Sequence, residues 1–326
     1  MHSAEERDRL RAAYRRFAED EARGKSPLYE ALCHGVAEGD DILDFLLTLP
    51  PPKRQPNLLL AAARHLCGTP RDWNAFHDGV MHHRDAVRAL MLEWSTQTNE
   101  PGRCAALLPL LARLPQPLAL LEVGASAGLC LLPDCYGYRY GGHVLKPDNS
   151  GAGAPIFPCQ ANMATPLPQS LPRVVWRAGL DVAPVDLTDP DQVAWLEALV
   201  WPEQTDRLAR LRAAIGIAAV QKPRLVQGDL RRDLARLAAE MPREATRVIF
   251  HTAVLAYVSS RAERAEFARA AQALCDVWIS NEVPQVFPEI AARAAASGPR
   301  GHFLIAANGQ PLAWADPHGA ALDWIA

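Results

Sequence analysis

The chain has 326 residues, enough for one large or two modest domains, and its apolar (49%) and charged (22%) fractions are ordinary for a soluble globular protein. A formal net charge of −3 argues against non-specific nucleic-acid binding, and seven cysteines without a C-x-x-C pair argue against a disulfide framework or a structural zinc site. The N-terminus lacks the apolar segment of a secretory signal and no apolar run reaches membrane-spanning length, so we expect a cytoplasmic protein without a membrane or nucleic-acid partner.

The first third of the chain carries helical periodicity throughout. Leu10, Tyr14 and Phe17 fall on one face of a helix, and Ser26-Pro27 is typical of an N-cap followed by first-turn proline. No segment before residue 115 alternates as a strand does. The pattern predicts an all-helical N-terminal cap region over residues 1–115, followed by an α/β domain over residues 116–326.

The first strand of that α/β domain leads into a glycine-rich turn. An apolar run from Leu118 to Val123 is followed by glycines at 124 and 128 and by a resumed apolar pattern from Leu129. This order predicts strand, tight turn and helix. Backbone amides at such a helix N-terminus can receive a ligand, and a Cβ on either glycine would obstruct both the turn and the ligand.

Three ligand chemistries use such a turn, and residue spacing distinguishes them. A dinucleotide fingerprint is disfavoured because Leu129 occupies its last small-residue position. A nucleophile elbow, G-x-S-x-G, matches with Ser126 as the nucleophile. The S-adenosylmethionine loop of class I methyltransferases matches through Glu122, Gly124 and Gly128, although Ser126 replaces its middle glycine. A closely packed turn without any ligand remains a further interpretation.

Acidic residues follow the next two predicted strands. Strand 174–176 continues to Asp181, which is placed to accept hydrogen bonds from a ribose diol, with Asp186 as a competing candidate. Strand 224–227 ends in Gly228-Asp229, and a carboxylate there suits the exocyclic amine of adenine. A helix N-cap is the competing role for Asp229.

The remaining strands complete a predicted seven-stranded sheet. Strand 247–250 ends in His251, which would face the ligand edge of an open α/β sheet and could transfer a proton, although a structural role is equally open. A fifth strand covers 277–280. Two segments joined by Asn308-Gly309 then predict an antiparallel hairpin. The glycine- and proline-rich segment 136–172 is predicted to be an insertion of short strands or a flap.

These motifs together resemble a bacterial domain-of-unknown-function family whose core is similar to class I S-adenosylmethionine-dependent methyltransferases. The resemblance covers nearly the whole chain. The stretches that carry it are Ser26-Pro-Leu-Tyr29, Gln55-Pro-Asn-Leu58, Thr98-Asn-Glu100, Gly102-Arg-Cys104, Glu122 to Leu129, Trp176-Arg177, Gly179-Leu-Asp181, Trp201-Pro-Glu203, Gln227-Gly-Asp229, His251 with Ala253 to Tyr257, Ser280-Asn-Glu282 and Asp316-Pro-His-Gly319. Two residues depart from the expected pattern: Cys130 replaces an asparagine, and Pro133 is predicted to end the helix after the loop early.

The resemblance implies a Rossmann-like class I methyltransferase sheet, mostly parallel with an antiparallel C-terminal hairpin, that binds S-adenosylmethionine and acts on a small-molecule acceptor. The implied cofactor residues are Glu122, Gly124, Ala125, Ser126, Gly128, Asp181, Gly228 and Asp229. His251 is the expected catalytic base, and Asn99, Arg103, Tyr257 and Glu282 are expected to line the acceptor pocket.

Two other function classes stay open from the sequence alone. A serine hydrolase would use Ser126 as nucleophile, His251 or His318 as base and Asp229 as acid. A non-catalytic relative of the fold would bind a partner through its helical region or would have lost its ligand. The methyl acceptor and the oligomeric state do not follow from the sequence.

Overall fold

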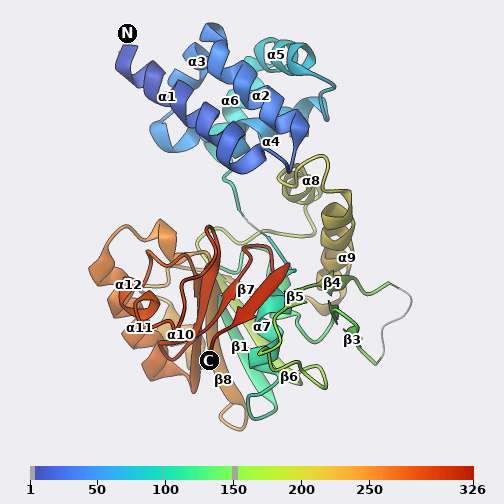
Figure 1. Cartoon of the computed structure of the whole chain (residues 1–326), viewed down its shortest axis with the longest axis vertical. Coiled ribbons are helices and arrows are strands. Elements are labelled where there is room, and N and C mark those ends of the chain that lie inside the picture. The colour runs from blue at the N-terminus through green and yellow to red at the C-terminus, as the bar shows by residue number, and fades with distance from the viewer. Residues whose placement is uncertain (1–3, 98, 149–152) are drawn as a thin grey trace. The chain divides into compact units, whose positions relative to one another are not determined.

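The structure, a computed structural model, describes residues 4–97, 99–148 and 153–326. It divides into two compact units: a helical unit, Met1–Thr98 with Thr188–Ala209, and an α/β unit, Asn99–Leu187 with Arg210–Ala326 (Figure 1). None of the helices in the described ranges is both long enough and apolar enough to cross a bilayer.

Helices alone make up the described part of the helical unit, as the sequence predicts. They are α1 (Ala4–Arg16), a π-helical turn (Phe17–Ala22), α2 (Pro27–Glu38), α3 (Asp40–Leu47), a 3-10 turn (Pro51–Lys53), α4 (Pro56–Cys67), α5 (Trp73–His82), α6 (Arg84–Glu93), α8 (Pro190–Ala198) and the first turn of α9 (Thr205–Gln221). Ser26 caps α2 as predicted, since its Oγ accepts a hydrogen bond from the Tyr29 amide at 3.1 Å.

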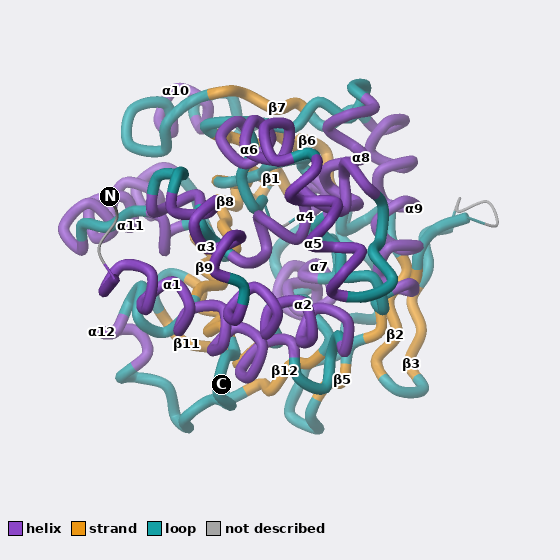
Figure 2. Tube along the Cα trace, turned by 90° about the horizontal axis from the view of Figure 1, so that it is seen from above, coloured by secondary structure: helices purple, strands orange, loops and turns teal. Residues whose placement is uncertain are grey.

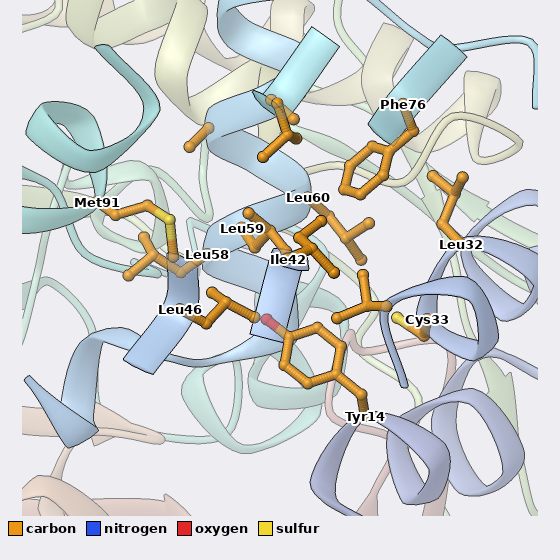
Figure 3. Packing of buried hydrophobic residues seen from close by; sticks show 14 of the residues in the cluster. Tyr14, Leu32, Cys33, Ile42, Leu46, Leu58, Leu59, Leu60, Phe76 and Met91 are labelled. Atoms are coloured by element: carbon orange, nitrogen blue, oxygen red, sulfur yellow. The ribbon is translucent and has the colours of Figure 1, made fainter. Parts of the chain in front are cut away.

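One apolar core holds this unit together (Figure 3). Tyr14, Ile42 and Leu46 meet the leucines of α4. The helical face predicted from Leu10, Tyr14 and Phe17 is buried in this core. Trp195 of α8 is only 1% exposed in the same core. That burial explains why a segment from beyond residue 115 belongs to the helical unit.

The α/β unit begins with a helix that the sequence assigned to the N-terminal region. It contains α7 (Arg103–Leu111), β1 (Leu118–Val123), β2 (Gly137–Tyr140), β3 (His143–Leu145), β4 (Ile156–Pro158), β5 (Gln160–Ala161), β6 (Val174–Asp181), the rest of α9, β7 (Arg224–Gln227), α10 (Leu234–Ala238), β8 (Thr246–Thr252), α11 (Arg261–Leu274), β9 (Val277–Glu282), α12 (Pro288–Ala291), β10 (Phe303–Ala307), β11 (Gln310–Ala315) and β12 (Ala321–Trp324). Two 3-10 turns, Leu129–Leu131 and Leu255–Tyr257, lie between these elements.

The main sheet has the order β5-β12-β11-β10-β9-β8-β1-β6-β7. Strands β7, β6, β1, β8 and β9 are parallel to one another, and β10, β11 and β12 add an antiparallel end. Numbered by their place in the chain, the five parallel strands run 3-2-1-4-5. The order therefore reverses between β1 and β8, and ligands of open α/β sheets bind outside the carboxyl ends of the strands at such a reversal.

Helices cover both faces of this sheet. Figures 1 and 2 show α10, α11 and α12 on one face and α7 on the other. The first face is lined by alternate residues of the strands, among them Val123, Ile249 and Trp278, which pack with Phe267 of α11. We call these the α11 face and the α7 face.

The antiparallel end confirms the hairpin prediction. Asn308 (φ 47°) and Gly309 (φ 78°) connect β10 to β11, and positive φ at both positions is the mark of a type I′ turn. The sheet nevertheless has nine strands rather than seven, because β12 and β5 extend this edge. The predicted insertion forms a separate three-stranded sheet, β3-β2-β4, and supplies β5.

Candidate functional site

The carboxyl ends of β1, β6, β7, β8 and β9 gather most of the residues singled out in the sequence. Glu122 lies near the end of β1 and the glycine turn follows it, Asp181 ends β6, Asp229 follows β7 and His251 lies near the end of β8. We call this region the carboxyl edge. A large open hollow of about 1230 Å³ lies elsewhere, beside Arg173 at the amino end of β6, and brings none of these residues together.

The backbone amides of the glycine turn are hydrogen-bonded within the protein, whereas the sequence predicted that they are open to a ligand. Those of Gly124 and Ala125 donate to the Leu180 carbonyl, and that of Gly128 donates to Ala125. The Ser126 amide donates to Asp181 Oδ2 and the Ala127 amide to Asn99 Oδ1, each at 2.8 Å. The prediction of free amides facing a ligand is therefore wrong for residues 124–128.

The helix predicted after the turn is also wrong. Only one 3-10 turn, Leu129–Leu131, follows Gly128, whose φ of 69° is left-handed, and Pro133 lies just beyond it. A single turn provides little of the dipole and few of the open amides of a full helix N-terminus.

Close packing accounts for both loop glycines. A Cβ on Gly124 would lie 2.4 Å from Val254 Cγ2, and one on Gly128 would lie 2.9 Å from Leu225 Cδ2. Both residues also have positive φ. Gly228 is similarly confined, with Asp233 Oδ2 2.8 Å from its Cβ position. These glycines allow the loops after β1, β7 and β8 to approach one another.

Asn99 fastens the glycine turn from outside the sheet. Its carboxamide nitrogen donates to Ser126 Oγ at 2.8 Å, while its oxygen accepts the Ala127 amide. Ser126 has a φ of 50°, an uncommon backbone conformation that these contacts hold in place. The contact places a predicted acceptor-pocket residue directly on the predicted cofactor loop.

Glu122 is the most unusual ionisable group of the site. Its side chain is 3% exposed, and Oε2 has no hydrogen-bond partner among the described residues. Burial raises the pKa of Glu122 well above the ordinary carboxyl range, and the nearby Cys130 adds to the shift while Arg103 opposes it. A cationic or hydrogen-donating ligand would supply the partner that Oε2 lacks.

Asp181 and Asp229 lie at the same edge, at the tips of adjacent strands. Strands β6 and β7 pair in register at Asp181 and Gln227, and the Gly228 amide donates to the Asp181 carbonyl. The two oxygens of Asp181 accept the Ser126 and Ala183 amides, each at 2.8 Å. Each oxygen keeps a second lone pair for a ligand hydroxyl.

Asp229 is already paired with an arginine. Arg231 donates to both of its carboxylate oxygens, at 2.9 and 2.6 Å, and also lies 3.5 Å from Glu263. These hydrogen bonds lower the pKa of Asp229 to about 2. Asp229 is not the N-cap of α10, because that position belongs to Asp233. An adenine amine would have to share or displace the Arg231 contact.

His251 is buried on the α11 face of the sheet. Its ring is 0% exposed on the α11 face, against Phe267, Trp278 and Phe287. Nδ1 lies 2.7 Å from Glu282 Oε1, and Nε2 has no partner among the described residues. An acceptor molecule cannot reach a fully enclosed imidazole in this conformation.

Glu282 was expected to line an acceptor pocket, but its carboxylate instead binds the loop that follows β8. Besides His251, its Oε1 accepts the amides of Val254 and Leu255, at 2.9 and 3.1 Å. This loop contains Ala253, whose φ of 55° is left-handed, and Tyr257, whose side chain is exposed. Of the expected acceptor residues, Tyr257 is thus the accessible one on this side.

On the α7 face, Arg103 joins elements that are far apart in the chain. Its guanidinium is buried and donates to the carbonyl and hydroxyl of Thr252, at 3.1 and 3.2 Å, and to the Pro317 carbonyl at 2.8 Å. Asn281 pairs in register with Thr252, is fully buried, and has no hydrogen-bond partner for either amide atom among the described residues. The sequence predicted a role for neither Thr252 nor Asn281, although Asn281 lies within the stretch Ser280-Asn-Glu282.

A second histidine also reaches this region. His318, in the loop after β11, has Nδ1 3.4 Å from Glu100 Oε2, and its side chain is 45% exposed. Glu100 precedes α7 and directly follows Asn99. Within the described ranges, no three His, Cys, Asp or Glu side chains are arranged to hold a metal ion.

Comparison with known proteins places the chain in a family. The model of an uncharacterised protein family conserved in bacteria (DUF2332) matches residues 11–324. The chain belongs to this family. Comparisons with curated proteins and with solved structures find no match. Membership confirms the predicted uncharacterised bacterial family, and it assigns neither a methyltransferase-like core nor a reaction to the carboxyl edge.

The raised pKa of Glu122 predicts a pH-dependent stability. The folded state binds this proton more tightly than the unfolded state, so the wild-type protein loses stability as the pH rises above the ordinary carboxyl pKa of about 4.3. We expect Glu122→Gln to raise the melting temperature at pH 8, by about 2–4 °C for each kcal/mol regained. The gain should shrink toward pH 5 in thermal denaturation followed by circular dichroism.

Glu266→Gln is the matched control, because Glu266 is exposed on α11. Its effect on the melting temperature should be the same at both pH values. A Glu122→Gln effect that does not grow with pH would contradict the assignment of a buried, proton-retaining carboxyl.

Proposed function

We propose that this protein binds S-adenosylmethionine and is methyltransferase-like, acting on a small-molecule acceptor. The observation that carries the proposal is the row of acids at the tips of three neighbouring parallel strands. Glu122 is the next-to-last residue of β1, Asp181 is the last residue of β6 and Asp229 follows β7, and these strands are adjacent in the sheet in that order. This row suits an elongated ligand with an amino-acid end, a ribose and a purine amine.

The sheet order supports the same proposal. The parallel order 3-2-1-4-5 is that of doubly wound, Rossmann-like sheets, and the reversal between β1 and β8 lies where such sheets bind ligands. The antiparallel strands after β9 agree with the resemblance to class I methyltransferases. Fold likeness alone does not assign chemistry, so the argument depends on the acids.

The glycine turn argues for a ligand without phosphates. A dinucleotide places its pyrophosphate on open amides at a helix N-terminus. Here the amides of residues 124–128 are all bonded within the fold, and only one 3-10 turn follows. S-adenosylmethionine carries no phosphate, so it does not need these amides.

Each acid then has a distinct role in the proposed complex. Glu122 would meet the ammonium of the methionine end, which would give a charged donor to an oxygen, Oε2, that has no partner within the described part of the chain. Asp181 would accept the ribose hydroxyls, and Asp229 would accept the adenine amine. Because the sulfonium already activates the methyl carbon, the protein mainly aligns the acceptor and excludes water.

The hydrolase alternative has less support from this geometry. Ser126 does have the positive φ of a strained turn, but its Oγ accepts a hydrogen bond from Asn99. Of its two proposed bases, His251 is enclosed on the α11 face and His318 faces Glu100 through Nδ1, while the proposed acid Asp229 is bound by Arg231. A nucleophilic serine needs a base within hydrogen-bond reach.

Isothermal titration calorimetry tests the cofactor assignment. We expect S-adenosylhomocysteine to bind the wild-type protein, and Asp181→Asn to weaken binding about 10-fold or more, because a charged hydrogen bond contributes about 1.5–3 kcal/mol. Asp85→Asn, on α6 of the helical unit, is the control and should bind like the wild type. Binding of NAD⁺ in place of S-adenosylhomocysteine would contradict the proposal.

A second prediction concerns Asp229, the proposed acceptor for the adenine amine, which is paired with Arg231. Exposed ion pairs are worth about 0.2–1 kcal/mol, so Arg231→Ala should tighten S-adenosylhomocysteine binding by about 1.4- to 5-fold, because Asp229 becomes free to accept the purine amine. Asp229→Ala should weaken binding. Equal affinity of the wild type and Asp229→Ala would remove Asp229 from the site.

A further inference from the structure

The reaction proposed above needs a group that takes a proton from a neutral acceptor. His251 is the histidine that the sequence favoured, but its ring is enclosed between aromatic side chains on the α11 face. Both histidines have a carboxylate beside Nδ1, Glu282 for His251 and Glu100 for His318, but the His318 side chain is 45% exposed and therefore accessible.

The loop that carries His318 is held firmly. Asp316 Oδ1 accepts the His318 amide at 2.8 Å, and the Gly319 amide donates to the Asp316 carbonyl. Gly319 has a φ of 79°, and a Cβ on it would lie 2.0 Å from the Gly102 carbonyl oxygen. Arg103 Nε donates to the Pro317 carbonyl. The imidazole is therefore attached to a backbone with a fixed position on the start of α7.

Glu100 orients the ring. Its carboxylate is buried, Oε1 accepts the Gly102 amide at 3.0 Å, and Oε2 lies 3.4 Å from His318 Nδ1. A carboxylate facing Nδ1 favours the tautomer that carries its hydrogen there. Nε2 is then the free base, and the carboxylate stabilises the imidazolium that forms when Nε2 takes a proton.

Residues 99–103 connect the His318 loop to the point where the strand order reverses. Asn99, next to Glu100, binds Ser126 and Ala127 in the loop after β1. Arg103 binds Thr252 at the end of β8. Residues 99–103 thus contact the loops on both sides of the β1–β8 reversal as well as the His318 loop.

We infer that His318, oriented by Glu100, is the base at the carboxyl edge that takes the proton from the methyl acceptor. This inference rests on the proposed function. The acceptor heteroatom forms a bond to the methyl carbon while the carbon–sulfur bond breaks, and that electron pair returns to sulfur to give the thioether. The proton leaves the acceptor for Nε2. Such a base serves acceptors that are neutral and protic, namely hydroxyl, amine or thiol compounds, whereas a carboxylate acceptor has no proton to lose.

Sinefungin provides a direct probe, because it is an analogue of S-adenosylmethionine with an amine-bearing carbon in place of the methylated sulfonium. Its amine should donate to His318 Nε2, a contact that S-adenosylhomocysteine cannot make. We expect His318→Ala to weaken sinefungin binding about 5- to 10-fold more than S-adenosylhomocysteine binding, as calorimetry measures both dissociation constants.

Two further variants test whether Glu100 acts by orienting the His318 ring. Glu100→Gln keeps an oxygen for the Gly102 amide but removes the charge beside Nδ1. It should therefore weaken sinefungin binding relative to S-adenosylhomocysteine binding in the same direction as His318→Ala, but by a smaller factor. His83→Gln, exposed in the helical unit, should change neither ligand's affinity.

The outcomes distinguish the inference from the function beneath it. If His318→Ala weakens both ligands equally, or neither, His318 does not face the transferred group and the inference is overturned while cofactor binding stands. If neither ligand binds the wild-type protein, the proposed function fails and the inference fails with it.

Discussion

The candidate site depends on one short segment, residues 99–103, which binds three loops that the chain order keeps far apart. Asn99 fixes the turn after β1, Arg103 fixes the end of β8, and Glu100 with Gly102 receives the loop around His318. Arg103 is buried, so its three hydrogen bonds to protein oxygens offset the cost of removing a guanidinium from water. Without this segment, the glycine turn would have no partner for Ser126 Oγ or the Ala127 amide.

The alternation of side chains along each strand divides the polar residues between the two faces of the sheet. His251 and Glu282 point to the α11 face, where aromatic rings enclose them and their contacts shape the loop after β8. Thr252 and Asn281 point to the α7 face, as does Glu122, whose register partner is Phe250. Glu122 Oε2 and both amide atoms of Asn281, which have no hydrogen-bond partner among the described residues, therefore lie close to the place where the sheet order reverses, on the side that Arg103 also approaches.

Local patterns predicted the elements well, and contacts between distant residues explain the rest. Apolar runs located the parallel strands, and Asn308-Gly309 identified a hairpin because both residues accept positive φ. The helix after Gly128 failed because a left-handed Gly128 and Pro133 leave room for one 3-10 turn. The partners of the loop amides could not be read from the sequence, since Asn99 lies 28 residues from Ala127 and Asp181 lies 55 residues from Ser126. The pairing of Glu100 with His318 spans a longer separation still, and Asp-Pro-His-Gly gave no local sign of its partner.

A crystal structure of the protein soaked with S-adenosylhomocysteine tests the central claim most directly, because it locates the ligand against all three acids at once. The account predicts the amino-acid end beside Glu122, the ribose hydroxyls on Asp181 and the adenine amine at Asp229, with the sulfur facing the His318 side. Density for the ligand at any other place, with Asp181 and Asp229 untouched, would contradict it.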